Sequence, residues 1–429
     1  MERKISVAGL VVFALLLAGV NVYANLDSGP YLLNITETSV EVVCEGDGGD
    51  DPGVVQWGPT PDLDFTEDMN RRLFHDDMFT ATLSGLSPAS VYYYRVIHEG
   101  EVSPVGSFYT PVAPGDHFTF VALGDTRSGH ITHQLVVNAI INNGIPDLVF
   151  NSGDLVADGE DKDQWQQFFG IEDDLLRNCI FGPVWGNHEN GSDFDLSKFN
   201  MFFTTGDSYS YRFGNAVFIV VNTEKACGVG GGQYNFLQGV LQEVDSDPDI
   251  DFKFVFFHKP AVTTCTSHDP DFSVLKGVME LCEQYGVHAV YTGHNHLYEH
   301  GIVNGVHHIV TGGGGAGTSG FIDPYDPDGW TIVHREKVNH FVEVSVSGSQ
   351  YTHTAMRINL SVMDTYTATV ADHGFPGPTP SDLLERANPL ACSLAASPGT
   401  VRTDASALFN VALLLLPAVI VRLRVRRKG

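Results

Sequence analysis

Five apolar runs in this chain end abruptly in a polar residue. Such a run is typical of a buried strand that leaves its loop at the carboxyl edge of a sheet. In open α/β sheets that edge is where sites form. The runs and the residues that follow them are 118–124 before Asp125, 148–153 before Asp154, 181–186 before Asn187 and His188, 252–257 before His258, and 287–291 before His294 and His296. We therefore expect these polar side chains to meet at one rim.

From residue 117 onward, amphipathic segments separate these runs. They cover 134–142, 164–177, 234–244 and 273–285. Strands that alternate with helices of this length predict an α/β sheet with helices on its faces. Residues 341–347 and 351–358, joined by Gly348-Ser349-Gln350, predict a closing hairpin.

The first part of the chain has a different pattern. Short runs rich in Val, Tyr, Phe and Thr alternate with Gly, Pro and Asp, at 39–44, 53–57, 79–83, 91–98 and 102–109. This spacing predicts a β-sandwich over residues 25–112. We expect the sandwich to serve as a spacer or lid support, and residues 111–115 (Pro-Val-Ala-Pro-Gly) to form a linker.

Both ends of the chain carry targeting patterns. Arg3 and Lys4 precede the apolar stretch 7–20, so residues 1–24 are predicted to be a signal peptide. Residues 359–404 are rich in Pro, Gly, Ser and Ala and predict a flexible stalk. The segment 405–429 is apolar to residue 421 and then basic, as in a hydrophobic C-terminal membrane anchor or a tail cut by a sorting protease. We expect the body to be secreted or held at the cell envelope or cell surface, outside the cytoplasm.

Composition narrows the classes of partner. The formal charge of −28 over 429 residues excludes a basic face for nucleic acid. The 45 glycines and 43% hydrophobic residues fit a globular protein with many turns. Export would permit disulfides, and Cys227 with Cys265 is the pair we favour because both lie in loops beside the expected rim.

The polar residues at the run ends suit a metal centre. Two divalent ions held roughly 3.5–4 Å apart can activate water and clamp a phosphoryl group. Such a pair needs carboxylate and amide oxygens, imidazole nitrogens and one shared carboxylate. A turn-capping Asp or Asn, or a core His, would explain any one motif alone, but not five in order.

The five ordered blocks resemble those of the calcineurin-like metallophosphoesterase superfamily. Residues 83–96, Leu-Ser-Gly-Leu-Ser-Pro through Tyr-Tyr-Tyr-Arg-Val, resemble the late strands of a fibronectin type III domain. Together they are similar to purple acid phosphatases and their bacterial relatives, over about residues 29–358. The resemblance implies a fibronectin III-like all-β sandwich followed by a catalytic α/β domain at 116–358 with four α/β/β/α layers.

The resemblance also implies roles by position. Asp125 and His296 would bind one metal, and Asp154 would bridge both. The second metal would be bound by Asn187, His258 and His294. His188 would stabilise the transition state or protonate the leaving oxygen. The cofactors would be two divalent or mixed-valence ions of Fe, Zn or Mn.

Two positions depart from the family pattern. Arg127 stands where many relatives have a ligating His, and Ala157 stands where purple acid phosphatases have the Tyr whose phenolate binds ferric iron. We therefore expect no purple Fe(III) site. Arg127 suits bidentate phosphate binding, and a salt bridge to a nearby Asp is an equal alternative. His130 or His133 is a candidate for the missing ligand.

We interpret the chain as an exported, acid phosphatase-like phosphoesterase. It would hydrolyse small-molecule phosphate monoesters by in-line attack of a metal-bound hydroxide. A phosphodiesterase or nucleotide hydrolase is the nearest alternative, because the same metals serve both. Another class is a non-catalytic surface binding protein, which the missing His at position 127 favours and the remaining ligand set opposes. Lys259 and His268 would either contact substrate or have no role.

Overall fold

The computed structural model of the chain describes residues 26–46, 51–73, 75–190, 197–322 and 330–370. The predicted signal peptide, most of the predicted stalk and the predicted anchor lie outside these ranges. Among the described residues, no helix is both long and apolar enough to cross a membrane.

The first part of the described chain is a β-sandwich, as predicted. One of its sheets contains β1 (Ser28–Leu33), β2 (Ser39–Glu45), β6 (His75–Ser84) and β5 (Asn70–Arg72). The other contains β4 (Phe65–Asp68), β3 (Val54–Gly58), β7 (Val91–His98), β8 (Glu101–Val102) and β9 (Gly106–Tyr109). Burial alternates along β7 because successive side chains point to opposite faces. The run 102–109, expected as one strand, is divided between β8 and β9.

The sandwich is continuous with the rest of the molecule. β1 pairs in parallel with β12 (Ile180–Pro183) at Leu32 and Ile180, so the first sandwich sheet extends into a ten-stranded sheet. The other strands of that sheet are β10 (Phe118–Leu123), β11 (Leu148–Asn151), β20 (His340–Ser347), β21 (Gln350–Arg357) and β22 (Val362–Thr369). β10, β11 and β12 run parallel, and the predicted hairpin is present as β20 and β21.

The stalk predicted to begin at residue 359 is wrong over β22, because these residues form a strand. Its residues pair with β21, and Ala368 is buried in the apolar core. The Asp364 carboxylate lies 2.7 Å from His300 Nδ1, which ties β22 to the second sheet. The ten-stranded sheet therefore extends past residue 358, the predicted end of the catalytic domain.

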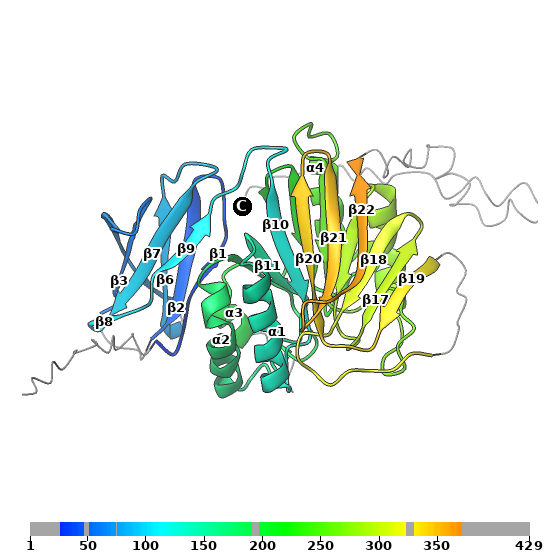
Figure 1. Cartoon of the computed structure of the whole chain (residues 1–429), viewed down its shortest axis with the longest axis horizontal. Coiled ribbons are helices and arrows are strands. Elements are labelled where there is room, and N and C mark those ends of the chain that lie inside the picture. Colours follow the sequence, from blue (N-terminus) through cyan, green and yellow to red (C-terminus); the bar gives the residue numbers. More distant parts are fainter. Residues whose placement is uncertain (1–25, 47–50, 74, 191–196, 323–329, 371–429) are drawn as a thin grey trace, which may run out of the picture. The chain divides into compact units, whose positions relative to one another are not determined.

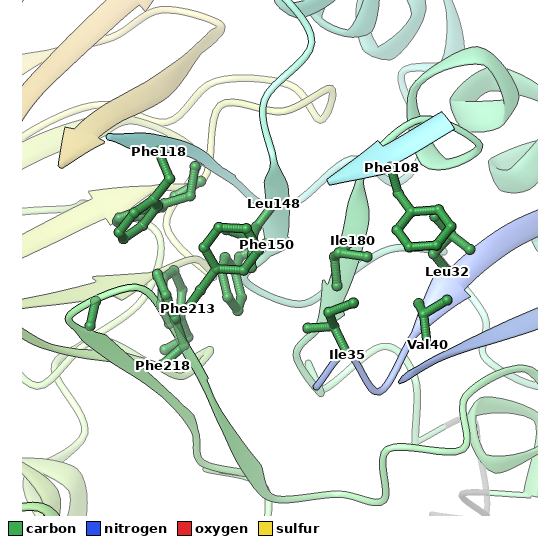
Figure 2. Close-up of a cluster of buried hydrophobic side chains, with 14 of the residues drawn as sticks. Leu32, Ile35, Val40, Phe108, Phe118, Leu148, Phe150, Ile180, Phe213 and Phe218 are labelled. Carbon is green, nitrogen blue, oxygen red and sulfur yellow. The ribbon is translucent and has the colours of Figure 1, made fainter. Parts of the chain in front are cut away.

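A second sheet of seven strands lies against the first. It contains β13 (Tyr209–Phe213), β14 (Ala216–Val220), β15 (Phe252–Phe256), β16 (Ala289–Thr292), β18 (Val306–Thr311), β17 (Tyr298–Val303) and β19 (Trp330–Glu336), in that order. Strands β14, β15, β16 and β18 are parallel. Figure 2 shows Phe118, Phe150 and Phe218 within the core between the sheets; Ile180, Leu32 and Phe108 belong to the same core, which therefore runs on into the sandwich.

Helices cover the outer faces of both sheets, which gives the predicted α/β/β/α layers (Figure 1). On the ten-stranded sheet lie α1 (His130–Asn143), α2 (Lys162–Leu176) and α3 (Ser197–Phe202). On the seven-stranded sheet lie α4 (Gly232–Val244), α5 (Phe272–Val274), the π-helical turn η1 (Leu275–Met279) and α6 (Glu280–Gln284). The segment expected as one helix at 273–285 is thus three short pieces.

The favoured disulfide is wrong. Both Cys227 and Cys265 are free thiols. The Cys227 sulfur instead lies 3.5 Å from the Ser273 hydroxyl, at the start of α5. Position in the sequence alone could not show that the two thiols remain unpaired.

Candidate metal centre

The predicted ligands converge from two sheets, where sequence alone suggested one rim. Asp125, Asp154 and Asn187 follow β10, β11 and β12 of the ten-stranded sheet, whereas His258, His294 and His296 follow β15 and β16 of the seven-stranded sheet. Two groups of donors result: Asp125, Asp154 and His296, and Asp154, His258 and His294. Within each group the ligand atoms lie within 4.8 Å of one another, and Asp154 is common to both.

The backbone turns sharply at these strand ends. Asp125 and Asp154 both have φ of 57°, and His294 has φ of 67°. Few residues other than glycine adopt this left-handed conformation, and Asp and His are among those that do so most often. The turns direct the side chains into the space between the two sheet edges.

Gly186 lets two of these turns pack against each other. A Cβ at this position would lie 2.3 Å from the Asp154 backbone nitrogen and 2.5 Å from Asp154 Oδ1. Any side chain here would push the β12 loop away from Asp154. The loop carries Asn187 and His188, so the glycine sets their distance from the shared carboxylate.

We expect Gly186→Ala to weaken metal binding by roughly 10- to 100-fold, as displacement of a ligand-supporting group does. Calorimetric titration with Mn²⁺ measures this. Gly170→Ala is the matched control, because nothing lies within 4 Å of a Cβ at Gly170 in α2. Unchanged Mn²⁺ affinity in Gly186→Ala would contradict the packing argument.

Backbone carbonyls orient three imidazoles in the same way. The Nδ1 atoms of His188, His258 and His296 lie 2.7, 2.9 and 2.8 Å from the carbonyl oxygens of Ala157, Ser152 and Gly317. A carbonyl only accepts hydrogen bonds, so each Nδ1 donates, and each ring in its neutral form keeps its lone pair on Nε2. Partners of this kind fix the tautomer of metal-binding histidines.

The second donor group surrounds one oxygen of Asp154. His258 Nε2 lies 3.2 Å from Asp154 Oδ1 and 3.1 Å from Asn187 Oδ1. Burial raises the pKa of Asp154, but the nearby His258, His188 and Arg127 outweigh it and hold that pKa below its ordinary value. Asp154 is therefore ionised, as a bridging ligand must be.

His294 completes this group as a neutral ring. Burial, then His258 and His268, lower the pKa of His294 to about 2, so its lone pair is free at any physiological pH. The His268 ring lies 4.1 Å from the His294 ring, centroid to centroid. His268, Lys259, Phe272 and His294 line one open pocket of about 550 Å³. His268 therefore lies at the site. The sequence alone had left open whether it contacts substrate or has no role.

The surroundings of Asp125 indicate whether the first donor group (Asp125, Asp154 and His296) suits a cation. Its side chain is fully buried, and neither carboxylate oxygen accepts a hydrogen bond in the structure. The His296 Nε2 atom lies 3.4 Å from Asp125 Oδ1. A buried carboxylate without hydrogen bonds is costly unless a positive charge meets it. The carboxylate oxygens and imidazole nitrogens gathered here are ligands that suit divalent metal ions.

Glu189 stands in the same block as Asn187 and His188, but sequence analysis assigned it no role of its own. Its buried carboxylate accepts hydrogen bonds from the backbone N–H groups of Asp154, Leu155, Val156 and Gly186, at 2.7–3.2 Å. Burial, then the charge of Asp154, raises the pKa of Glu189 to about 8. Its adjacency to Asn187 and His188 was the signal available in the sequence.

The two candidate catalytic residues also lie at the site. His188 Nε2 is 3.9 Å from Asp154 Oδ2, and the His188 side chain is partly exposed. Arg127 Nε lies 3.0 Å from the same oxygen, so the salt-bridge alternative is the one the structure shows. His133 does not supply a missing ligand, because it is buried against Glu172 at 2.7 Å. His130 begins α1 and is exposed.

Comparisons with known proteins agree with this geometry. Residues 118–298 match the family model described as calcineurin-like phosphoesterase. Among curated proteins, the chain is 25% identical over 263 residues to purple acid phosphatase 15 of Arabidopsis thaliana, covering 51% of this chain and 48% of that protein. It is 26% identical over 306 residues to probable inactive purple acid phosphatase 1 of the same plant, covering 57% and 50%.

Among solved structures, purple acid phosphatase PPD1 of yellow lupin (Lupinus luteus) superposes with a TM-score of 0.70 at 19% identity. The match covers 89% of this chain and 79% of that one. It shows a common fold that includes the N-terminal sandwich. The chain spans about half the length of the curated relatives it matches.

Proposed function

Because residues 118–298 form a calcineurin-like phosphoesterase domain, we propose that the chain hydrolyses phosphate monoesters at a two-metal site. The observation that carries this proposal is the pair of donor groups that share the buried Asp154. The first ion would be held by Asp125, Asp154 and His296. The second would be held by Asp154, Asn187, His258 and His294. Bound divalent ions would supply Lewis acidity, which activates water and offsets phosphoryl charge.

The protein residues around these positions would orient the ester and move a proton. His188 is held through Nδ1 by the Ala157 carbonyl, which leaves Nε2 facing the site. A protonated Nε2 can donate to the leaving oxygen or to a phosphoryl oxygen as charge develops there. Monoesters are favoured over diesters because the fold matches a purple acid phosphatase from the sandwich through the catalytic domain.

The direct test compares two substrates and counts metal. The full chain is purified, loaded with Mn²⁺ or Zn²⁺, and assayed with p-nitrophenyl phosphate and with its bis ester. We expect bound metal, with faster hydrolysis of the monoester. Faster diester hydrolysis would assign the phosphodiesterase alternative, and bound metal without turnover on either ester would favour the non-catalytic one.

We expect His188→Ala to slow turnover by roughly 10²- to 10⁴-fold, the usual range for loss of a general acid. Metal content should stay unchanged, because His188 belongs to neither donor group. Steady-state kinetics and elemental analysis measure the two quantities. His117→Ala is the control, since His117 is exposed and contacts Ser345. Equal loss of metal in His188→Ala would make His188 a ligand and overturn its proposed role.

We also propose that the protein acts outside the cytoplasm, on the strength of the N-terminal signal pattern. Amino-terminal sequencing of the protein from its native cell tests this. A mature chain that begins at Asn25 is expected, and a chain that keeps residues 1–24 would contradict export by cleavage.

A further inference from the structure

The site has two halves. Asp125, Asp154 and His296 form the first half, and Asp154, His258 and His294 form the second. The halves differ in the groups that face their donor atoms. In the second half, the Asp154 Oδ1 atom faces His258 Nε2 at 3.2 Å and accepts a hydrogen bond from the His188 backbone N–H at 3.0 Å. In the first half, the Asp154 Oδ2 atom faces the guanidinium of Arg127 at 3.0 Å. The shared carboxylate thus already has a cation on one side.

The same guanidinium reaches a second donor of the first half. Arg127 Nη2 lies 3.4 Å from His296 Nε2. His296 Nδ1 donates to the Gly317 carbonyl, so Nε2 holds the only lone pair of the neutral ring. That lone pair can meet an arginine N–H or a metal ion, but not both. Arg127 and a first metal ion therefore compete for Asp154 Oδ2 and for His296 Nε2.

Charge adds to this competition. A guanidinium carries a fixed positive charge. The Arg127 side chain is 17% exposed, so water screens its charge only in part. Beside it, Asp125 and Asp154 are the two carboxylates of the first half. The fixed cation leaves that half with one net negative charge, where a neutral residue at position 127 would leave two. A divalent ion placed there would also repel the guanidinium.

We propose that Arg127 is a built-in cation that competes with the first metal ion, so that the chain binds the second ion tightly and the first ion weakly. The tightly bound ion is held by Asp154, Asn187, His258 and His294. This inference rests on the metal site assigned under the proposed function and specifies its stoichiometry. It also explains how a chain without the usual His at position 127 keeps its other donors in place.

Metal counting without turnover tests the proposal. The metal-free full chain is titrated with Mn²⁺ by calorimetry, and the loaded protein is examined by electron paramagnetic resonance. We expect one tight Mn²⁺ per chain, a second site weaker by roughly tenfold or more, and the spectrum of isolated ions. In Arg127→Gln the second site should tighten by roughly tenfold or more, with a spin-coupled Mn²⁺ pair.

Two further variants serve as controls. Arg127→Lys retains the charge and should still bind a single tight ion, which separates charge from general disruption of the fold. Arg212→Gln removes an arginine charge at β13, where Arg212 pairs with Asp247, and should behave as wild type.

The outcomes are distinct. A wild-type chain that binds two ions with affinities within about threefold, with Arg127→Gln unchanged, would overturn the proposal while leaving the proposed function intact. One tight ion without ester hydrolysis would support the stoichiometry and contradict the proposed function. Absence of metal in both wild type and Arg127→Gln would overturn both.

Discussion

Asp154→Asn is expected to abolish turnover and to remove most of the bound metal. Asp154 belongs to both donor groups and is 1% exposed. The amide keeps the shape of the side chain but removes the charge that His258, His188 and Arg127 surround. Loss of roughly 4 kcal/mol of transition-state stabilisation corresponds to about a thousandfold in rate, which we take as the minimum effect.

The measurement pairs p-nitrophenyl phosphate turnover with elemental analysis of the dialysed protein. Asp245→Asn is the matched control, because Asp245 pairs with Lys253 on the surface after α4. We expect that control to keep its turnover and its metal. An Asp154→Asn protein with near-normal metal and a rate loss below tenfold would show that Asp154 does not bridge the two donor groups.

Sequence could predict the donors because each ends a buried strand. In the run 118–124, residues 120–124 carry no polar side chain before Asp125, and a parallel strand exposes its carboxyl end at a sheet edge. The hydrophobic pattern could not show that the strand ends belong to two sheets. A strand that is buried on both faces has the same apolar sequence whichever sheet contains it. The sequence also could not predict the pairing of β1 with β12 at Leu32 and Ile180, because strand pairing depends on residues that are distant in the chain.

Other features depended on contacts between distant segments. His133 lies six residues after Arg127, yet its imidazole does not reach the site. It lies 2.7 Å from the Glu172 carboxylate of α2, and both side chains are buried between packed helices. Composition predicted a stalk over residues 359–404, whereas Val362–Thr369 forms a strand through its pairing with β21 and the Asp364–His300 contact. The composition of that segment did not exclude a strand; its partners decided the outcome.

Glu189 shows most clearly what a strand-end pattern omits. It is fully buried, and its two oxygens receive four backbone N–H groups from the turns after β11 and β12. Those turns carry Asp154, Asn187 and His188. A peptide N–H that loses its acceptor in a buried place costs about 1–3 kcal/mol. One side chain therefore holds both turns of the ten-stranded sheet that form the shared part of the site.

We expect Glu189→Ala to lower the free energy of unfolding by about 4 kcal/mol or more, because all four N–H groups lose their acceptor. Glu189→Gln should fall between Ala and wild type, since its single carbonyl oxygen can accept from only part of the set. Urea denaturation measures the stability, and Mn²⁺ titration of the folded fraction should show weaker binding in the same order. Glu243→Gln, exposed on α4, is the control and should match wild type. If Glu189→Ala were as stable as Glu243→Gln, the four hydrogen bonds would not hold the turns, and the preorganisation of Asp154 would need another source.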